Sequence, residues 1–281
     1  MSGEVFVDRA FVRLAEGLVH YRHAGTQSAD TLPVYLAHSG PGNSRGLAPL
    51  VAAMGANRFT IAPDMLGNGD SDPPARRNTD IAYYADCVVR VMDALQIDKI
   101  DYYGTHTGAM IGLELGIAHP DRVSHLVLDG LMVIDEADRP DLLANYAPEI
   151  KPDDHGGYLA WVYQFCRDMM IFYPYYKKDG DHLTGRGAPD MEFMHPMIVD
   201  VMKALETYHC AYRAAFSYDV PAAIAQLTHP VMLSCQSWDP LRHDLPRVSQ
   251  MMPAATSKLY PLGATPAQIA THVCAFLDGQ L

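Results

Sequence analysis

The chain has 281 residues, of which 49% are hydrophobic and 19% charged, and its formal net charge is -12. This length suits one α/β domain that carries an insertion. The composition is that of a globular protein rather than a disordered one, and no apolar run approaches the roughly 20 residues that span a bilayer. Because negative charge dominates, we expect neither a nucleic acid nor a membrane as partner.

The N-terminal residues bear on the location of the protein, and its cysteines bear on disulfides and metal binding. Met1 to Glu4 lack a cationic stretch followed by an apolar block, so we expect no secretory signal and predict a cytoplasmic protein. The five cysteines are odd in number and far apart, which argues against a disulfide framework and against metal-ligand spacing. We therefore predict an enzyme without metal or cofactor that acts on a small molecule. The sequence does not decide whether the protein forms a homodimer.

The first half of the chain alternates between strand and helix patterns. Residues 4–14 and 17–23 are typical of an antiparallel hairpin. Short apolar runs at 34–37, 59–62, 100–103 and 126–128 are typical of buried parallel strands. Asp80 is a good N-cap for the helix that follows, and a second helix runs from about Gly108 to before Pro120. This alternation predicts a parallel sheet with helices on both faces.

The pattern changes between residues 135 and 218, where Tyr, Trp, Met, His and Pro become frequent and no strand of the earlier kind occurs. We predict an inserted helical cap here. Strand patterns return at 231–235 and 258–260, and Thr265 and Pro266 begin a last helix. The predicted organisation is thus a core domain over 1–134 and 219–281, interrupted by a cap over 135–218.

One segment between a predicted strand and a predicted helix has the spacing of a nucleophile elbow. In Tyr102-Tyr103-Gly104-Thr105-His106-Thr107-Gly108-Ala109, glycines stand two residues before and two residues after His106. A tight strand-to-helix turn needs residues without Cβ at such positions, and it lifts the central side chain above the sheet. The spacing predicts that His106 is presented in this way.

Other motifs occur around this elbow in a familiar order. His38-Ser39-Gly40-Pro41-Gly42 resembles the oxyanion loop of proline-iminopeptidase-like enzymes, Asp64 to Asp72 resembles an Asp-x-x-Gly-x-Gly-x-Ser-Asp loop, and Ser237-Trp238-Asp239-Pro240 resembles the loop that carries the acid of a catalytic triad. Outside the cap, almost the whole chain resembles the α/β-hydrolase superfamily. The resemblance implies a mostly parallel eight-stranded sheet, oxyanion donors on the backbone of Gly40 and Thr107, and Asp239 as the acid.

Two departures from the superfamily pattern concern catalysis. The elbow carries His106 in place of serine, aspartate or cysteine, and the loop at 261–266, where relatives carry the catalytic histidine, has none. His272 lies about seven residues into the last helix, roughly 10 Å beyond its start, so we expect it to serve packing. We infer a relocated pair in which Asp239 accepts a hydrogen bond from His106, whose other ring nitrogen acts as general base or as nucleophile. We prefer the base.

Substrate-binding candidates are weaker predictions. The resemblance implies that His38 braces the oxyanion loop, and Ser39 lies beside it. In the cap, Trp161 and Tyr173 are aromatic candidates, although most such residues serve packing. Arg167 is a candidate anchor for a carboxylate unless Asp168 neutralises it.

The predicted reaction is hydrolysis of a small, partly apolar ester, lactone, amide or carbon–carbon bond. One alternative is a lyase, decarboxylase or cofactor-independent oxygenase that uses the same His-Asp pair only to remove a proton. The other is a ligand-binding pseudoenzyme. The missing loop histidine keeps both alternatives open.

Overall fold

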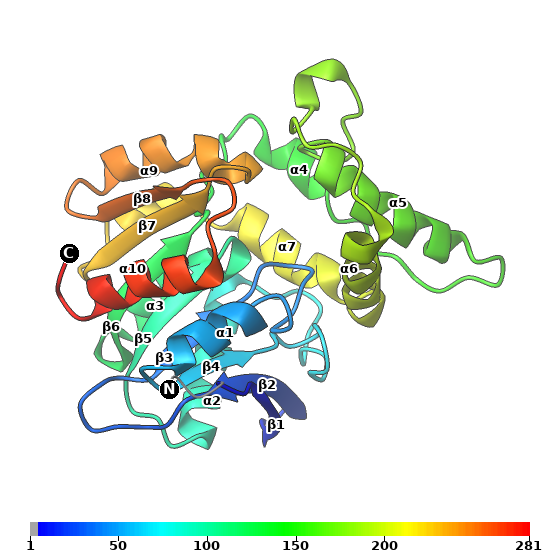
Figure 1. Cartoon of the computed structure of the whole chain (residues 1–281). Coiled ribbons are helices and arrows are strands. Elements are labelled where there is room, and N and C mark those ends of the chain that lie inside the picture. The colour runs from blue at the N-terminus through cyan, green and yellow to red at the C-terminus, as the bar shows by residue number, and fades with distance from the viewer. Residues whose placement is uncertain (1–4) are drawn as a thin grey trace.

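An eight-stranded sheet forms the centre of the protein, and its strand order is β1-β2-β4-β3-β5-β6-β7-β8. The computed structural model describes residues 5–281 (Figure 1). Strands β1 and β2 form an antiparallel hairpin, whereas β3 to β8 run parallel. The predicted fold class is confirmed. The strands are β1 (Asp8–Arg13), β2 (Leu18–Ala24), β3 (Val34–Ala37), β4 (Thr60–Pro63), β5 (Ile100–Thr105), β6 (Val123–Asp129), β7 (Val231–Gln236) and β8 (Thr256–Tyr260).

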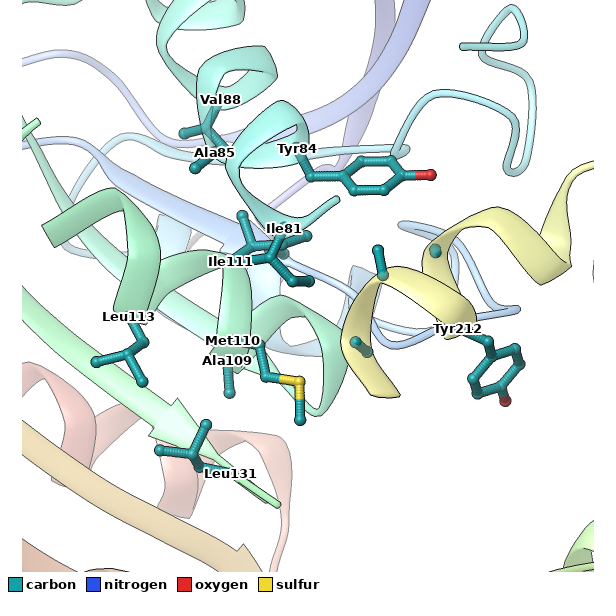
Figure 2. Close-up of a cluster of buried hydrophobic side chains, with 14 of the residues drawn as sticks. Ile81, Tyr84, Ala85, Val88, Ala109, Met110, Ile111, Leu113, Leu131 and Tyr212 are labelled. Carbon is teal, nitrogen blue, oxygen red and sulfur yellow. The ribbon is translucent and has the colours of Figure 1, made fainter. Parts of the chain in front are cut away.

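Alternate residues of the buried strands serve two separate apolar layers. Val34 and Leu36 of β3 pack with helices α1 (Ala48–Gly55) and α10 (Pro266–Leu277). Tyr35 and Ala37 belong instead to the larger cluster with α2 (Ile81–Ala94) and α3 (Thr107–Ala118), whose facing side chains Figure 2 shows. Because helices cover both faces of the sheet, the sequences of these strands are continuously apolar and do not alternate between apolar and polar residues.

Local sequence rules account for the ends of several helices. The Asp80 side chain accepts a hydrogen bond from the N–H of Tyr83, which caps α2 as predicted. Thr265 and Gln268 form a reciprocal capping box at the start of α10. Helix α3 ends at Ala118, ahead of Pro120.

The segment between β6 and β7 is helical and contains an isolated bridge between Phe172 and Leu183. In Figure 1 its helices α4, α5 and α6 lie to one side of the sheet, and α7 runs back toward α3. The limits at residues 135 and 218 stay a prediction. The helices are α4 (Arg139–Asn145), α5 (Gly157–Ile171), α6 (Met191–Lys203), α7 (Tyr208–Ser217) and α8 (Val220–Ile224).

Some elements carried no clear sequence pattern. These are α1, the helix α9 (Leu245–Met251), and the short 3-10 helices η1 (Pro120–Arg122), η2 (Gly180–His182) and η3 (Pro240–His243). The start of the expected hairpin at Glu4, and the stretch Met1 to Glu4 as a whole, lie outside the described residues. Over residues 5–281, no helix combines the length and apolarity that a membrane crossing requires.

Candidate active site

His106 stands alone between the last residue of β5, Thr105, and the first residue of α3, Thr107. Its backbone has φ 49° and ψ -109°, a conformation that residues with a side chain rarely adopt. A Cβ on Gly104 would lie 2.2 Å from the carbonyl oxygen of Gly108, so the close approach of backbone requires glycine there. The strained elbow expected from the sequence is therefore present at His106.

Asp239 lies against the imidazole of His106. The loop after β7 ends at Asp239, which caps η3 by accepting the N–H of Leu241 through Oδ1 at 2.8 Å. Its other oxygen, Oδ2, lies 2.6 Å from Nε2 of His106. The carboxylate side chain is only 6% exposed and the imidazole 35% exposed. The pair therefore has a buried acid and a ring that solvent can reach.

The pKa shifts of the two groups indicate which of them donates the hydrogen bond. Burial by itself raises the pKa of Asp239, but the charge and hydrogen bond of His106, with the Leu241 N–H, outweigh it and hold that pKa below its usual value. Asp239 is therefore the ionised acceptor, and the Nε2–H of His106 donates. Burial would lower the pKa of His106, yet Asp239, with a smaller contribution from Asp129, raises it overall.

The last residue of β6 and the glycine after it shape the other side of the ring. The carbonyl oxygen of Asp129 accepts the N–H of His106 at 2.8 Å, and the Asp129 carboxyl accepts the Ser234 hydroxyl at 2.6 Å. Burial raises the pKa of that carboxyl. A Cβ on Gly130, whose φ is +63°, would lie 2.5 Å from Cδ2 of His106. Gly130 thus leaves the space that the imidazole occupies.

The two expected oxyanion donors come close together. A Cβ built on Gly40 would lie 3.8 Å from the Thr107 hydroxyl oxygen. Within residues 5–281 neither the Gly40 N–H nor the Thr107 N–H donates to another residue. The Gly40 carbonyl, in contrast, accepts the hydroxyl of Tyr212 on α7 at 2.9 Å. Sequence reasoning did not select Tyr212, which thereby ties a helix of the 135–218 segment to the oxyanion loop.

His38 and Asp64 hold the oxyanion loop in place through hydrogen bonds. The N–H of Met65 donates to Nε2 of His38 at 2.9 Å, so Nδ1 carries the proton and donates to the Ser39 carbonyl at 3.0 Å. Both nitrogens of this buried ring are therefore engaged within the protein. Asp64 accepts the N–H of Ser44 at 2.7 Å. These contacts assign His38 a bracing position and leave Ser39, whose carbonyl is engaged, partly exposed.

Among the described residues, His20, Asp64 and Asp70 bring potential metal-ligand atoms close together. Its atoms are already paired. His20 donates from Nδ1 to Asp64 at 2.9 Å and accepts Arg9 Nε at 3.2 Å, while Asp70 contacts Lys203 at 2.5 Å. Because cations and hydrogen bonds satisfy these groups, we assign the cluster a structural role.

The loop at 261–266 brings no imidazole to the site, in keeping with its sequence. His272 lies on α10 with its ring edge-on to Tyr260, the centroids being 6.0 Å apart. Burial lowers the pKa of His272. These contacts fit the packing role expected from its position along the helix.

The three candidates from the 135–218 segment differ in their surroundings. The Trp161 ring stacks on Phe165 with centroids 4.8 Å apart. Arg167 pairs with Asp168 at 2.8 Å, the alternative that the sequence had left open. Tyr173 is partly buried, and its hydroxyl contacts the Met132 sulfur at 3.2 Å. Burial, with negative charges that include Asp239, raises the pKa of Tyr173 well above its usual value. Tyr173 is thus linked electrostatically to the acid of the pair.

A cation that sequence reasoning did not select also lies near the acid. The Arg186 guanidinium carbon is 4.6 Å from the ring centroid of Trp238, and its charge helps to lower the pKa of Asp239. The sequence around Arg186 is Leu-Thr-Gly-Arg-Gly-Ala-Pro, an ordinary loop. It offered no signal beyond the residue type itself.

Comparisons with known proteins agree with this fold. The alpha/beta hydrolase fold family matches residues 33–165. A putative carbamate hydrolase, RutD, of Caulobacter sp. (strain K31) is 26% identical over 94% of this chain and 97% of its own length. The 2-hydroxymuconate semialdehyde hydrolase of Pseudomonas sp. (strain CF600) is 42% identical, but over 35% of this chain, and the chain spans only 36% of that relative's length.

Solved structures show the same fold at low identity. An epoxide hydrolase mutant of Vigna radiata superposes with a TM-score of 0.73 and 15% identity, over 97% of this chain and 99% of that one. The enol-lactonase of Burkholderia xenovorans LB400 has a TM-score of 0.63 and 18% identity, over 96% and 97%.

The parallel sheet and its strained elbow define an α/β-hydrolase fold. Together with the family match and the curated relatives, they show that the chain belongs to the α/β-hydrolase superfamily. The resemblance inferred from the sequence is thus confirmed. Its elbow nevertheless carries His106.

Proposed function

We propose that the protein hydrolyses a small, partly apolar carbonyl compound, with His106 as general base and Asp239 as the residue that orients it. The observation that carries this proposal is the 2.6 Å contact between His106 Nε2 and Asp239 Oδ2 on a solvent-reachable elbow. Cytoplasmic location, and action without metal or cofactor, belong to the same proposal.

The proton transfer follows from the tautomer. Because Nε2–H donates to the carboxylate, Nδ1 of His106 is unprotonated and basic. It removes a proton from water while the water oxygen attacks the substrate carbonyl, and the buried carboxylate of Asp239 stabilises the imidazolium that results. When the tetrahedral intermediate collapses, the imidazolium returns that proton to the leaving group.

The oxyanion of the intermediate is assigned to the N–H groups of Gly40 and Thr107. Their proximity, and the lack of another acceptor for them in the part of the chain that the structure describes, support this role. Such donors contribute about 3 to 4 kcal/mol each to the stabilisation of developing negative charge. His38 and Tyr212 act on this site indirectly because they hold the loop that carries Gly40.

A nucleophilic His106 would form an acyl-imidazole instead. Its hydrolysis would then require a second base, and the loop at 261–266 supplies no histidine for that purpose. We therefore favour the base. Intact-protein mass spectrometry during turnover of a slow substrate distinguishes the two routes, because only the nucleophilic route adds the acyl mass to His106.

The substrate class is a carbonyl compound with an ester, lactone, amide or activated carbon–carbon bond. The relatives' names, a carbamate hydrolase and a semialdehyde hydrolase, are consistent with this range. A screen of acyl esters, lactones and amides against the wild type and His106→Ala tests the proposal, which predicts turnover that the variant loses. Turnover in ¹⁸O-labelled water must place solvent oxygen in the product. Product without the label would favour the lyase, decarboxylase or oxygenase alternative, and unchanged turnover by His106→Ala would refute the role of His106.

A further inference from the structure

Arg186 is partly buried and forms no direct salt bridge with any of residues 5–281. Its guanidinium lies over the Trp238 ring at 4.6 Å from the centroid. Over residues 5–281 no carboxylate lies within salt-bridge distance of it, and its side chain donates no hydrogen bond. Desolvation lowers the pKa of Arg186. The negative charge of Asp239 offsets part of this effect, and a carboxylate from outside the chain would supply the direct ion pair that the chain does not.

The position of Arg186 links it to the His106–Asp239 pair. Trp238, whose ring contacts the Arg186 guanidinium, immediately precedes Asp239 in the chain. The charge of Arg186 contributes to the lowered pKa of Asp239. The cation therefore lies beside the acid of the pair, where it can attract a group attached to a bound substrate.

A neighbouring arginine shows the contrast. Arg167 of α5 pairs with the buried carboxylate of Asp168, which also binds Lys178 at 2.6 Å. Because the Asp168 carboxylate already neutralises Arg167, we expect Arg167 to bind an added anion only weakly. Arg186 makes no direct ion pair among the described residues, although the charge of Asp239 acts on it, and its contact with a ring face uses none of its N–H groups.

We propose that Arg186 is a specificity-determining residue that binds a carboxylate on the substrate, held in place by its stacking on Trp238. The proposal rests on the proposed function and narrows its substrate class to carbonyl compounds that also carry a carboxylate. A guanidinium presents paired N–H groups that match the two oxygens of a carboxylate. The carboxylate is bound beside Asp239 while His106 faces the carbonyl.

Binding without turnover gives the primary test. Isothermal titration compares 4-phenylbutyrate, a small and partly apolar carboxylate, with the neutral 4-phenylbutyramide. We expect the wild type to bind the carboxylate about ten-fold or more tightly than the amide. Arg186→Gln should lose this preference, Arg186→Lys should keep part of it, and the matched control Arg167→Gln should keep all of it. Circular dichroism melts verify that each variant is folded.

Turnover gives a second readout. The ratio of kcat/KM for 4-nitrophenyl hydrogen succinate to that for the uncharged 4-nitrophenyl butyrate should exceed one in the wild type and fall in Arg186→Gln. The ratio, rather than either rate, is the readout, because any effect of the substitution on the His106–Asp239 pair acts on both esters. Equal binding of 4-phenylbutyrate and its amide by the wild type, or a preference that survives in Arg186→Gln, overturns the proposal.

The two proposals fail separately. If neither ester is hydrolysed but the binding preference depends on Arg186, the carboxylate site stands and the hydrolysis does not. If the esters are hydrolysed with no preference that depends on Arg186, the hydrolysis stands and the carboxylate site does not.

Discussion

His106 and Asp239 are separated by 133 positions in the sequence, yet their side chains meet at 2.6 Å. Asp239→Asn removes the charge that fixes the tautomer of His106 and stabilises its cation. We predict a loss of kcat/KM of about 10³ to 10⁴-fold with the fold intact, by analogy with the loss of the acid from a catalytic triad. Steady-state kinetics and a thermal melt test this, with Asp244→Asn as the control carboxylate in the same loop region. Near-normal turnover by Asp239→Asn would exclude the pairing.

The pH dependence of activity follows from the same contact. A general base works only when unprotonated, so kcat/KM should fall as the pH drops through the pKa of His106, which Asp239 holds above its usual value. In Asp239→Asn the attraction is lost while partial burial remains, so the pKa falls. The acidic limb of the residual activity should therefore move to lower pH. A limb at the same pH in both proteins would show that another group controls it.

Gly130 should matter because of the imidazole beside it. A methyl group in Gly130→Ala would lie 2.5 Å from Cδ2 of His106 and would displace the ring from Asp239. Gly263 has a similar positive φ, and a Cβ there meets nothing within 4 Å, so Gly263→Ala reproduces the backbone strain without the clash. We expect both variants to lose about 1 kcal/mol of stability from strain. Only Gly130→Ala should also lose most of its kcat, and equal kinetic losses in the two would contradict the clash.

The hydroxyl of Tyr212 offers a test of the oxyanion loop. Tyr212→Phe removes the donor to the Gly40 carbonyl, a hydrogen bond worth about 1 kcal/mol. We predict that kcat decreases about five- to ten-fold because the Gly40 N–H is held less firmly. Tyr218→Phe, which removes the hydroxyl that bonds Glu114 from the end of the same helix, serves as the control. The prediction fails if both variants retain wild-type kcat.

Local rules in the sequence predicted the parts of the site that depend on local geometry. Gly104 and Gly108 identified the elbow because a tight turn needs residues without Cβ: a Cβ on Gly104 would lie 2.2 Å from the Gly108 carbonyl oxygen, and one on Gly108 would lie 2.5 Å from the Ala37 carbonyl oxygen. The position of Asp239 followed from the resemblance of its loop. The hairpin and the alternation of strands and helices gave the sheet in the same way.

The remaining parts depend on long-range packing, for which the sequence has no local pattern. Arg167 and Arg186 are both arginines in an aromatic-rich segment, and only the folded chain shows that Asp168 neutralises the first while the second lies on Trp238. Tyr212 and Gly130 are likewise defined by contacts with residues 172 and 24 positions away. Nothing in their own neighbourhoods sets them apart from packing residues.

Asp64 should be a main determinant of acid stability. Burial by itself raises its pKa, but the hydrogen bonds that Asp64 accepts from His20 and from the N–H groups of Ser44 and Asp70 outweigh burial and lower the pKa to about 2, from an ordinary value of 3.8. A group with a depressed pKa in the folded state stabilises the protein above its unfolded pKa, so this stabilisation is complete above about pH 4 and is lost as the pH falls toward 2. Its size is about 2 kcal/mol.

Asp64→Asn should therefore lower the free energy of unfolding by about 2 kcal/mol at pH 7, and the difference from wild type should shrink as the pH falls from 4 toward 2. Urea unfolding at pH 7 and near pH 3 measures both quantities. Asp72→Asn is the control, because its exposed carboxylate accepts the Leu18 N–H rather than holding the buried loop. Asp64 positions the loop that carries Gly40 by accepting the N–H of Ser44. A stability difference that did not depend on pH would mean that packing, rather than the charge of Asp64, holds the oxyanion loop in place.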